Sequence, residues 1–128
     1  MARISLAIRL DNISILDIEN LFSTIIYPNK YEHTSKGTKM YYFENEMIWV
    51  TCELSNWSLL ANGLYYTYLG ILYKKSLKNS IDYISNLIDL LNEYQIKIHL
   101  ECEEQDDNGN VTIDEFIIHS KEDLLKLR

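Results

Sequence analysis

The chain has 128 residues, a size typical of one domain, and 47% of them are apolar, which suffices for a core without metals or disulfides. It carries 19 acidic and 12 basic residues, a formal net charge of −7. Because nucleic-acid binding draws most of its affinity from a basic surface, this charge argues against nucleic acid as a direct partner. We therefore expect residues 1–128 to form a single acidic domain.

The cysteines and the amino terminus indicate the compartment. Cys52 and Cys102 each lie in an alternating apolar pattern, which is typical of buried free thiols. Free thiols favour a reducing, cytoplasmic location. Arg3 and Arg9 interrupt the apolar residues of the amino terminus, so we expect no secretory signal there.

One uncharged stretch, residues 54–73, has about the length of a membrane span. Its serines, asparagines, threonine and glycines would each be costly in hydrocarbon. The pair Asn62-Gly63 within it is also a specific signal for a tight hairpin turn. We therefore expect no contact with a membrane.

The first predicted elements are a strand and a helix. Residues 3–10 alternate apolar and polar side chains, a pattern typical of a half-buried strand, and residues 11–12 are expected to end it. Ser14, with Asp17 three positions later, resembles a capping box at the start of a helix. That helix is expected to stop before Pro28, because the residue preceding a proline disfavours helical geometry.

The middle of the chain predicts a loop and two strands. Residues 29–39 are polar and contain a glycine, so they form the longest expected loop, a favoured place for functional residues. Residues 40–44 and 47–54 then read as two strands joined by a turn near Asn45.

The densest aromatic run, residues 64–73, has no charge and suits a buried strand. The Asn62-Gly63 turn predicts a hairpin that pairs this strand with residues 57–61. In an alternative interpretation residues 57–73 form a helix, which their two glycines disfavour.

The remaining elements complete an α+β fold. Apolar residues spaced three and four apart predict a helix over residues 77–93. Residues 96–103 alternate as a strand, which we pair with residues 111–119 through a three-residue loop, 108–110. Ser120 begins a last, short helix. We expect a two-layer sandwich, a mostly antiparallel sheet covered by two main helices plus a short C-terminal helix.

Two sets of residues are candidates for binding a protein partner. Residues 101–123 hold nine acids against one base, which could steer a basic partner but also suits a solvated hairpin tip. Tyrosines in the aromatic run could anchor such a partner or simply pack. The acidic candidates are Glu101, Glu103, Glu104, Asp106, Asp107, Asp114 and Glu115, and the aromatic ones are Tyr65, Tyr66 and Tyr68.

Two metal sites come into consideration, and we expect neither. Residues 104–115 resemble the calcium loop of EF-hand proteins, but Glu104 stands where that family has Asp, and strand-like patterns flank the loop. The predicted hairpin places His99 opposite His119 beside Glu101, a possible divalent-metal set. Exposed strand residues are the simpler interpretation of these histidines.

Motifs of catalysis are missing from the chain: it has no phosphate-binding loop, nucleophile elbow or Cys-x-x-Cys. We therefore expect no catalytic residues, no cofactor, and a protein that is not an enzyme.

Small size, acidic charge, ten tyrosines and missing catalytic motifs together resemble the immunity proteins that bacteria pair with polymorphic or contact-dependent toxins. The resemblance is one of general character over the whole chain and transfers no residue. It implies a cytoplasmic monomer or homodimer that neutralises a cognate toxin, such as a nuclease, by binding it. Alternatives are a phage-encoded inhibitor of a bacterial defence system, a small metal-dependent hydrolase and a calcium-binding module.

Overall fold

The computed structural model describes residues 2–25, 38–55 and 58–127. The elements in chain order are β1 (Arg3–Ile13), α1 (Ile15–Ile25), β2 (Thr38–Glu44), β3 (Ile48–Ser55), β4 (Tyr65–Tyr73), the 3-10 helix η2 (Lys78–Ser80), α2 (Ile81–Glu93), β5 (Leu100–Gln105), β6 (Val111–Ile118) and α3 (Lys121–Leu125). The six strands form one sheet in the order β2-β3-β4-β1-β5-β6, and every neighbouring pair is antiparallel.

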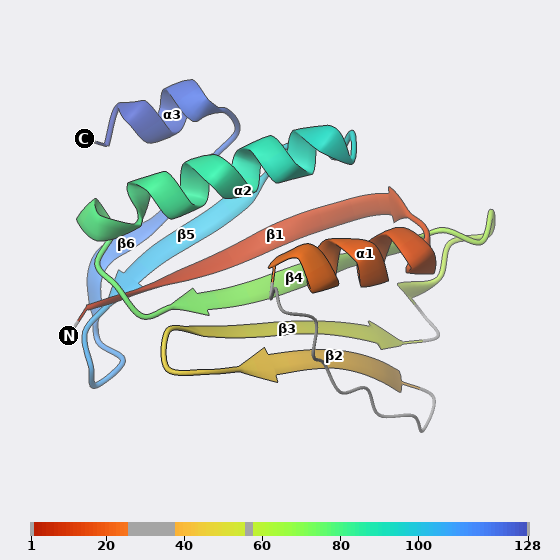
Figure 1. Ribbon diagram of the computed structural model, residues 1–128, viewed down its shortest axis with the longest axis horizontal. Coiled ribbons are helices and arrows are strands. Elements are labelled where there is room, and N and C mark those ends of the chain that lie inside the picture. The colour runs from red at the N-terminus through yellow and green to blue at the C-terminus, as the bar shows by residue number, and fades with distance from the viewer. Residues whose placement is uncertain (1, 26–37, 56–57, 128) are drawn as a thin grey trace.

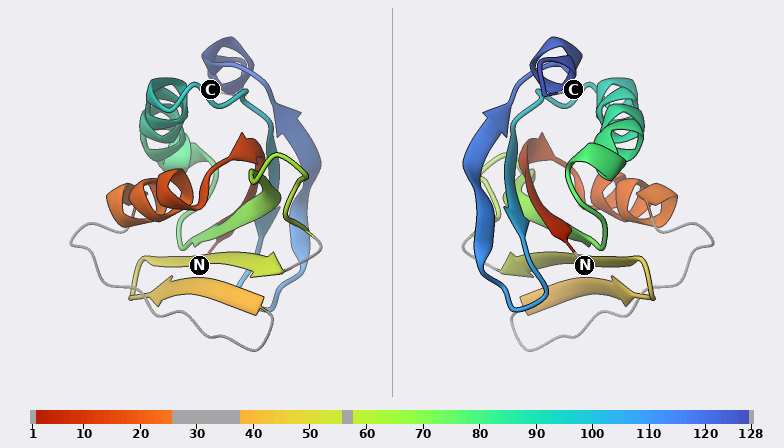
Figure 2. Two further views of the ribbon diagram at one scale, coloured as in Figure 1. Left: turned by 90° about the vertical axis from the view of Figure 1, so that its right-hand side faces the viewer. Right: turned by 90° about the vertical axis from the view of Figure 1, so that its left-hand side faces the viewer.

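The helices α1 and α2 lie side by side on one face of this sheet (Figure 1). Figure 2 shows the sheet edge-on and curved, with none of the described helices on its other face. The protein is therefore an α+β two-layer sandwich, as predicted. The second face of the sheet is left without a helical layer, and it is called the uncovered face below.

The core lies between the sheet and the helices. In β1, at the centre of the sheet, Ile4, Leu6, Ile8 and Leu10 are all at most 1% exposed. From α2, Ile84, Ile88 and Leu91 pack into the same core, also at most 1% exposed. Both sets follow the period of their element, two for the strand and three to four for the helix, which is why the sequence predicted them. The thiols of Cys52 and Cys102 are buried and free, as expected.

The first strand runs further than predicted. Residues 11–12 do not end β1; the pairing with β4 shifts between Leu10 and Ile13, and Asn12 takes a positive φ of 55° within that bulge. An asparagine tolerates this left-handed conformation better than most residues, so the strand bends and continues. The predicted cap of α1 is confirmed, since the backbone amide of Asp17 donates to Ser14 Oγ at 3.2 Å. Pro28 and most of the predicted loop 29–39 lie outside the described residues, and Thr38 and Lys39 belong to β2.

The predicted turn between β2 and β3 is confirmed. Asn45 Oδ1 accepts from the amides of Met47 and Ile48, at 2.8 and 2.9 Å. The predicted strand at residues 57–61 is wrong, because its described part makes only an isolated bridge, Leu59 to Tyr65. The Asn62-Gly63 turn does form, with Gly63 at φ 82°. The strand β4 pairs instead with β1 along most of its length and with β3 over residues 69–73. The alternative helix over residues 57–73 is also wrong.

The C-terminal half follows the prediction in outline. The predicted helix 77–93 starts as η2 and continues as α2. Strand β5 begins at Leu100, later than predicted, and pairs with β6 in the predicted register at Leu100 and Cys102. Two register shifts then replace the expected three-residue loop with a five-residue turn, 106–110. Its closure comes from the carboxylate Oδ1 of Asp106, which accepts from two amides of the turn at 2.9 and 3.0 Å.

The last helix starts as predicted, with the amide of Asp123 donating to Ser120 Oγ at 3.3 Å. Only Leu124 of its leucines is buried, because α3 contacts α2 and β6 along a single side. Among the described residues, no helix has the length and apolar character needed to cross a membrane.

Candidate functional site

The middle of the uncovered face is built from small side chains. Ala7 of β1 lies opposite both Gly70 of β4 and Glu101 of β5, and Gly70 lies opposite Thr51 of β3. A Cβ added at Gly70 would lie 3.2 Å from Thr51 Oγ1. A glycine in a strand often marks a place where another group comes close to the backbone. Here the missing side chain of Gly70 leaves a depression in the uncovered face.

A groove of about 480 Å³ opens on this floor, within the size range of small-molecule sites. It extends from the pair Thr51 and Gly70 past the point where the ladder between β3 and β4 ends, after Cys52 and Leu69. Beyond this pair the hydroxyl of Thr67 donates to the carbonyl oxygen of Glu53 at 3.0 Å and so bridges the two strands. The groove is lined by Thr51, Glu53, Ser55, Ser58, Tyr66, Thr67, Tyr68 and Gly70.

One end of the groove is fixed by a hydroxyl that binds backbone. Ser58 is 3% exposed, and its Oγ donates to the carbonyl oxygen of Ser55 at 2.7 Å. The same Oγ accepts from the amide of Ser55 at 3.1 Å. Since the hydroxyl satisfies both backbone groups of Ser55, which pairs with Thr38 of β2 but not with β4, this wall is held in place on the side of β4.

Two tyrosines stand along the groove. Tyr66 and Tyr68 are 37% and 48% exposed, large values for aromatic side chains on a sheet. The carboxylate of Glu101, on the far side of β1, acts on the hydroxyl of Tyr68. Desolvation and then this carboxylate raise the pKa of Tyr68 above its ordinary value of 10.0. Tyr68 therefore stays protonated over the whole neutral range.

Further charged groups lie next to this pair. Arg9, opposite Tyr68 in β1, places its Nε 3.0 Å from Asp11 Oδ2. His99 Nε2 lies 3.9 Å from Glu101 Oε2. Lys97 lies with Arg9, Asp11 and His99 around a small hollow. Together with Glu53, this part of the face has three carboxylates against one guanidinium and one ammonium, so its formal charge is negative when the histidines are neutral.

The predicted juxtaposition of His99 and His119 beside Glu101 is present. The two rings meet edge to face with centroids 5.3 Å apart, and His119 Nδ1 lies 3.3 Å from the carbonyl oxygen of Ile98. In the part of the chain that the structure describes, no three His, Cys, Asp or Glu side chains are grouped so that they could hold a metal ion. The expectation that calcium binds weakly at best stays a prediction, and strands do flank that loop.

The predicted partner-binding residues do not form one surface. Glu101 and Glu103 lie on the uncovered face, whereas Glu104 faces the helical layer, since successive residues of a strand point to opposite sides. For the same reason Tyr65 packs against the core, away from Tyr66 and Tyr68. The other acidic candidates are spread over the turn, with Asp106 and Asp107, and over the edge strand β6, with Asp114 and Glu115. A basic protein partner stays a prediction.

Comparisons with known proteins add one structure. No family model matches the chain, and no curated protein matches it. Among solved structures, the chain is similar to a phage SAM lyase in complex with S-methyl-5'-thioadenosine. The TM-score is 0.42 at 12% identity, over 93% of this chain and 91% of that chain. Similarity at this level identifies no shared site.

This comparison corrects two expectations from the sequence. The similar structure is that of an enzyme and not of an immunity protein, which contradicts both the expected toxin-neutralising function and the expectation that the protein is not an enzyme. The physical reason for the error is that both rested on composition and on missing short motifs. A site assembled from distant strands, such as the Tyr68 and Glu101 pair, leaves no motif in the sequence.

Sequence reasoning missed most of the groove. Thr51, Glu53 and Gly70 meet only because β3 and β4 are neighbours and then separate, which no local pattern reveals. Gly70 gave the one usable signal, since a glycine inside an aromatic strand often marks a close approach. Arg9 was read only as an interruption of the amino-terminal apolar pattern.

Proposed function

We propose that the protein binds a small organic cation, a quaternary ammonium or a sulfonium, in the groove of the uncovered face. The observation that carries this proposal is that Tyr66 and Tyr68 stand half-exposed along one groove with the carboxylate of Glu53 among its lining residues. An aromatic ring attracts a cation to its face, and a nearby carboxylate adds a full charge to that attraction.

The charges of the site favour a cation over an anion. Arg9 is the guanidinium nearest to Tyr68, and Asp11 pairs with it at 3.0 Å. The carboxylates of Glu53 and Glu101 then outnumber the ammonium of Lys97, which lies beside Arg9 and His99. An anionic ligand would meet this excess charge, whereas a cation would partly neutralise it.

The pair of Tyr68 and Glu101 also provides groups that can move a proton. Tyr68 is a protonated donor, and Glu101 is a carboxylate that lies 3.9 Å from His99 Nε2. A tyrosine, a carboxylate and an imidazole in contact are residue types used in general acid and base catalysis. The two free thiols support a cytoplasmic location for this activity.

The test uses ligand pairs that differ in charge. Choline is compared with its neutral isostere 3,3-dimethylbutan-1-ol. S-adenosylmethionine, a sulfonium, is compared with S-methyl-5'-thioadenosine, which is neutral and also lacks the amino-acid chain on sulfur. Binding is followed by calorimetry and by NMR, and the ligands are recovered and analysed for conversion. We expect the cations to bind and to shift the signals of Tyr66, Tyr68 and Gly70, and the neutral partners to bind more weakly.

A variant pair locates the site. Tyr68→Leu removes a ring in the groove and should weaken cation binding about fivefold, which corresponds to about 1 kcal/mol for a cation over an exposed ring. Trp49→Leu is the matched control, because Trp49 is 41% exposed on β3 but does not line the groove. Equal losses in the two variants would contradict the assignment of the cation to the groove.

A further inference from the structure

A second cavity lies at the junction of the helical layer and the β5–β6 hairpin. Its volume is about 650 Å³, within the range of small-molecule sites. Leu77 and Ile81, at the start of the helical segment, and Ile113 of β6 form apolar walls. The cavity is therefore separate from the groove, which belongs to β3 and β4.

Glu104 is the polar group that the surrounding elements hold in this cavity. Its Oε2 accepts from the backbone amide of Leu77 at 2.7 Å, and its Oε1 accepts from the hydroxyl of Thr112 at 2.8 Å. The side chain is thus tied to the helical layer on one side and to β6 on the other. Because a carboxylate has about four lone-pair sites, each oxygen can accept one more hydrogen bond.

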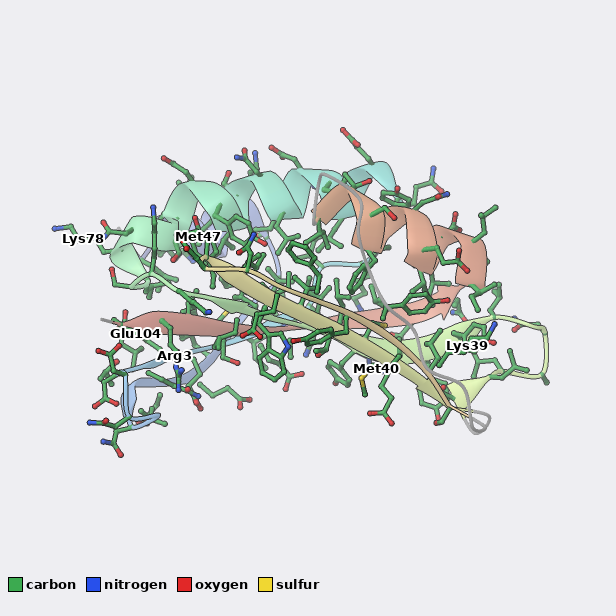
Figure 3. All side chains as sticks on the ribbon, turned by 60° about the horizontal axis from the view of Figure 1, so that its bottom comes forward. Arg3, Lys39, Met40, Met47, Lys78 and Glu104 are labelled. Atoms are coloured by element: carbon green, nitrogen blue, oxygen red, sulfur yellow. The ribbon has the colours of Figure 1, made fainter. Side chains whose placement is uncertain are left out.

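The charges around the cavity select the kind of group that can bind there. Among the lining residues that the structure describes, Glu104 and Asp82 are acidic and Lys78 is basic, so acidic side chains outnumber basic ones. Figure 3 shows Lys78 pointing outward from the start of the helical segment, at the same end of the sheet as Glu104. Lys78 therefore leaves the carboxylate of Glu104 open to a ligand.

We propose that this cavity is a second binding site, for a primary ammonium group carried on an apolar body. The ammonium group donates to the free lone pairs of Glu104, and the apolar body packs against Leu77, Ile81 and Ile113. A primary ammonium fits better than a quaternary one, because a quaternary ammonium has no N–H to donate to the acceptors of Glu104.

The experiment uses 2-phenylethylamine and its neutral counterpart 2-phenylethanol, titrated into the full chain at millimolar concentrations and followed by NMR. We expect the amine to shift the signals of Leu77, Ile81 and Ile113, and Glu104→Gln to weaken its binding about tenfold, the effect of one lost charged hydrogen bond. The alcohol, which can donate only an uncharged O–H, should bind more weakly and should respond less to Glu104→Gln.

A second pair of variants keeps the test decisive if Glu104→Gln disturbs the fold. Ile113→Trp narrows the cavity from β6 and should abolish the shifts, whereas Ile117→Trp, an exposed position on the same strand but outside the cavity, should leave them unchanged. Absence of shifts at Leu77, Ile81 and Ile113 would overturn the proposal. Equal affinity for the amine and the alcohol would show that Glu104 does not bind the ammonium group. Shifts confined to Tyr66, Tyr68 and Gly70 would assign the amine to the groove instead.

Discussion

Replacing Tyr83 by phenylalanine should stabilise the protein. Tyr83 of α2 stacks on Tyr73 of β4, with centroids 4.2 Å apart and rings 5° from parallel. Its hydroxyl is buried, and no partner for it lies among the described residues. A buried polar group without a hydrogen bond costs about 1 to 3 kcal/mol, and phenylalanine keeps the stacked ring while removing that group. We take the lower end, about 1 kcal/mol, as the expected gain.

The same substitution should change how stability depends on pH. Burial, and then Tyr73, raises the pKa of Tyr83 above its ordinary value of 10.0. Below about pH 10 the hydroxyl is protonated in the folded and the unfolded chain, but above it the unfolded chain loses this proton first, so stability falls as pH rises. Tyr83→Phe should therefore lose less stability than the natural chain above about pH 10.

Thermal and urea unfolding measure both effects. For a chain of this length, 1 kcal/mol corresponds to about 4 °C in Tm. Tyr73→Phe is the matched control, because it alters the other ring of the stack, whose hydroxyl is not among the buried groups without a partner. A Tyr83→Phe variant that is less stable than the natural chain, or one with the same alkaline loss, would refute this account of the buried hydroxyl.

Four further outcomes are expected. Glu104→Ala leaves the amide of Leu77 without its acceptor and should lower the free energy of unfolding in urea by about 2 kcal/mol. Glu103→Ala, on the uncovered face, should change it by no more than about 0.5 kcal/mol. Equal losses would contradict the role given to the hydrogen bond between Glu104 and Leu77. Burial raises the pKa of both Cys52 and Cys102 from 9.0 to about 12. Thiol reagents at neutral pH should therefore label them only as fast as the chain unfolds, and the stability of the fold should decrease as pH rises from 9 toward 12. Rapid labelling of the folded chain would be inconsistent with this burial. The amides of Asn110 and Asn108 lower the pKa of Asp106, so its carboxyl signal should titrate below 3.8 in NMR, and a midpoint at or above 3.8 would speak against the turn described. Gly70→Val fills the floor of the groove and should weaken choline binding at least about fivefold. Ala7→Val, at the position opposite Gly70 on the same face, should leave choline binding unchanged. Similar losses of affinity in the two variants would place the ligand outside the groove.

Local patterns predicted the parts of the fold that local physics determines. The alternation of Ile4, Leu6 and Ile8 can be buried only on one side of a strand, and the apolar stripe of α2 has only one side to bury. The cap at Ser14 and the turn at Asn45 needed a single side chain each. These elements give the α+β class and most of the core.

What the sequence could not predict depends on pairing between distant strands. The bulge at Asn12 and the shifts in the β5–β6 hairpin use left-handed or unpaired residues that also occur in ordinary turns. The pair of Tyr68 and Glu101 requires β1 to lie between β4 and β5. The groove requires the β3–β4 ladder to end early. Neither condition leaves a periodic signal in the sequence. The sequence therefore indicated only a strand rich in tyrosine and, separately, an acidic stretch at residues 101–123.

The central claim is that the groove of the uncovered face recognises positive charge beside aromatic rings. Its most direct test is an NMR and calorimetric titration of the natural chain with choline and with 3,3-dimethylbutan-1-ol, which have the same shape and differ in charge. The account predicts that choline binds more tightly and shifts Tyr66, Tyr68 and Gly70. Equal affinity for the two ligands, or choline shifts that avoid these three residues, would contradict it.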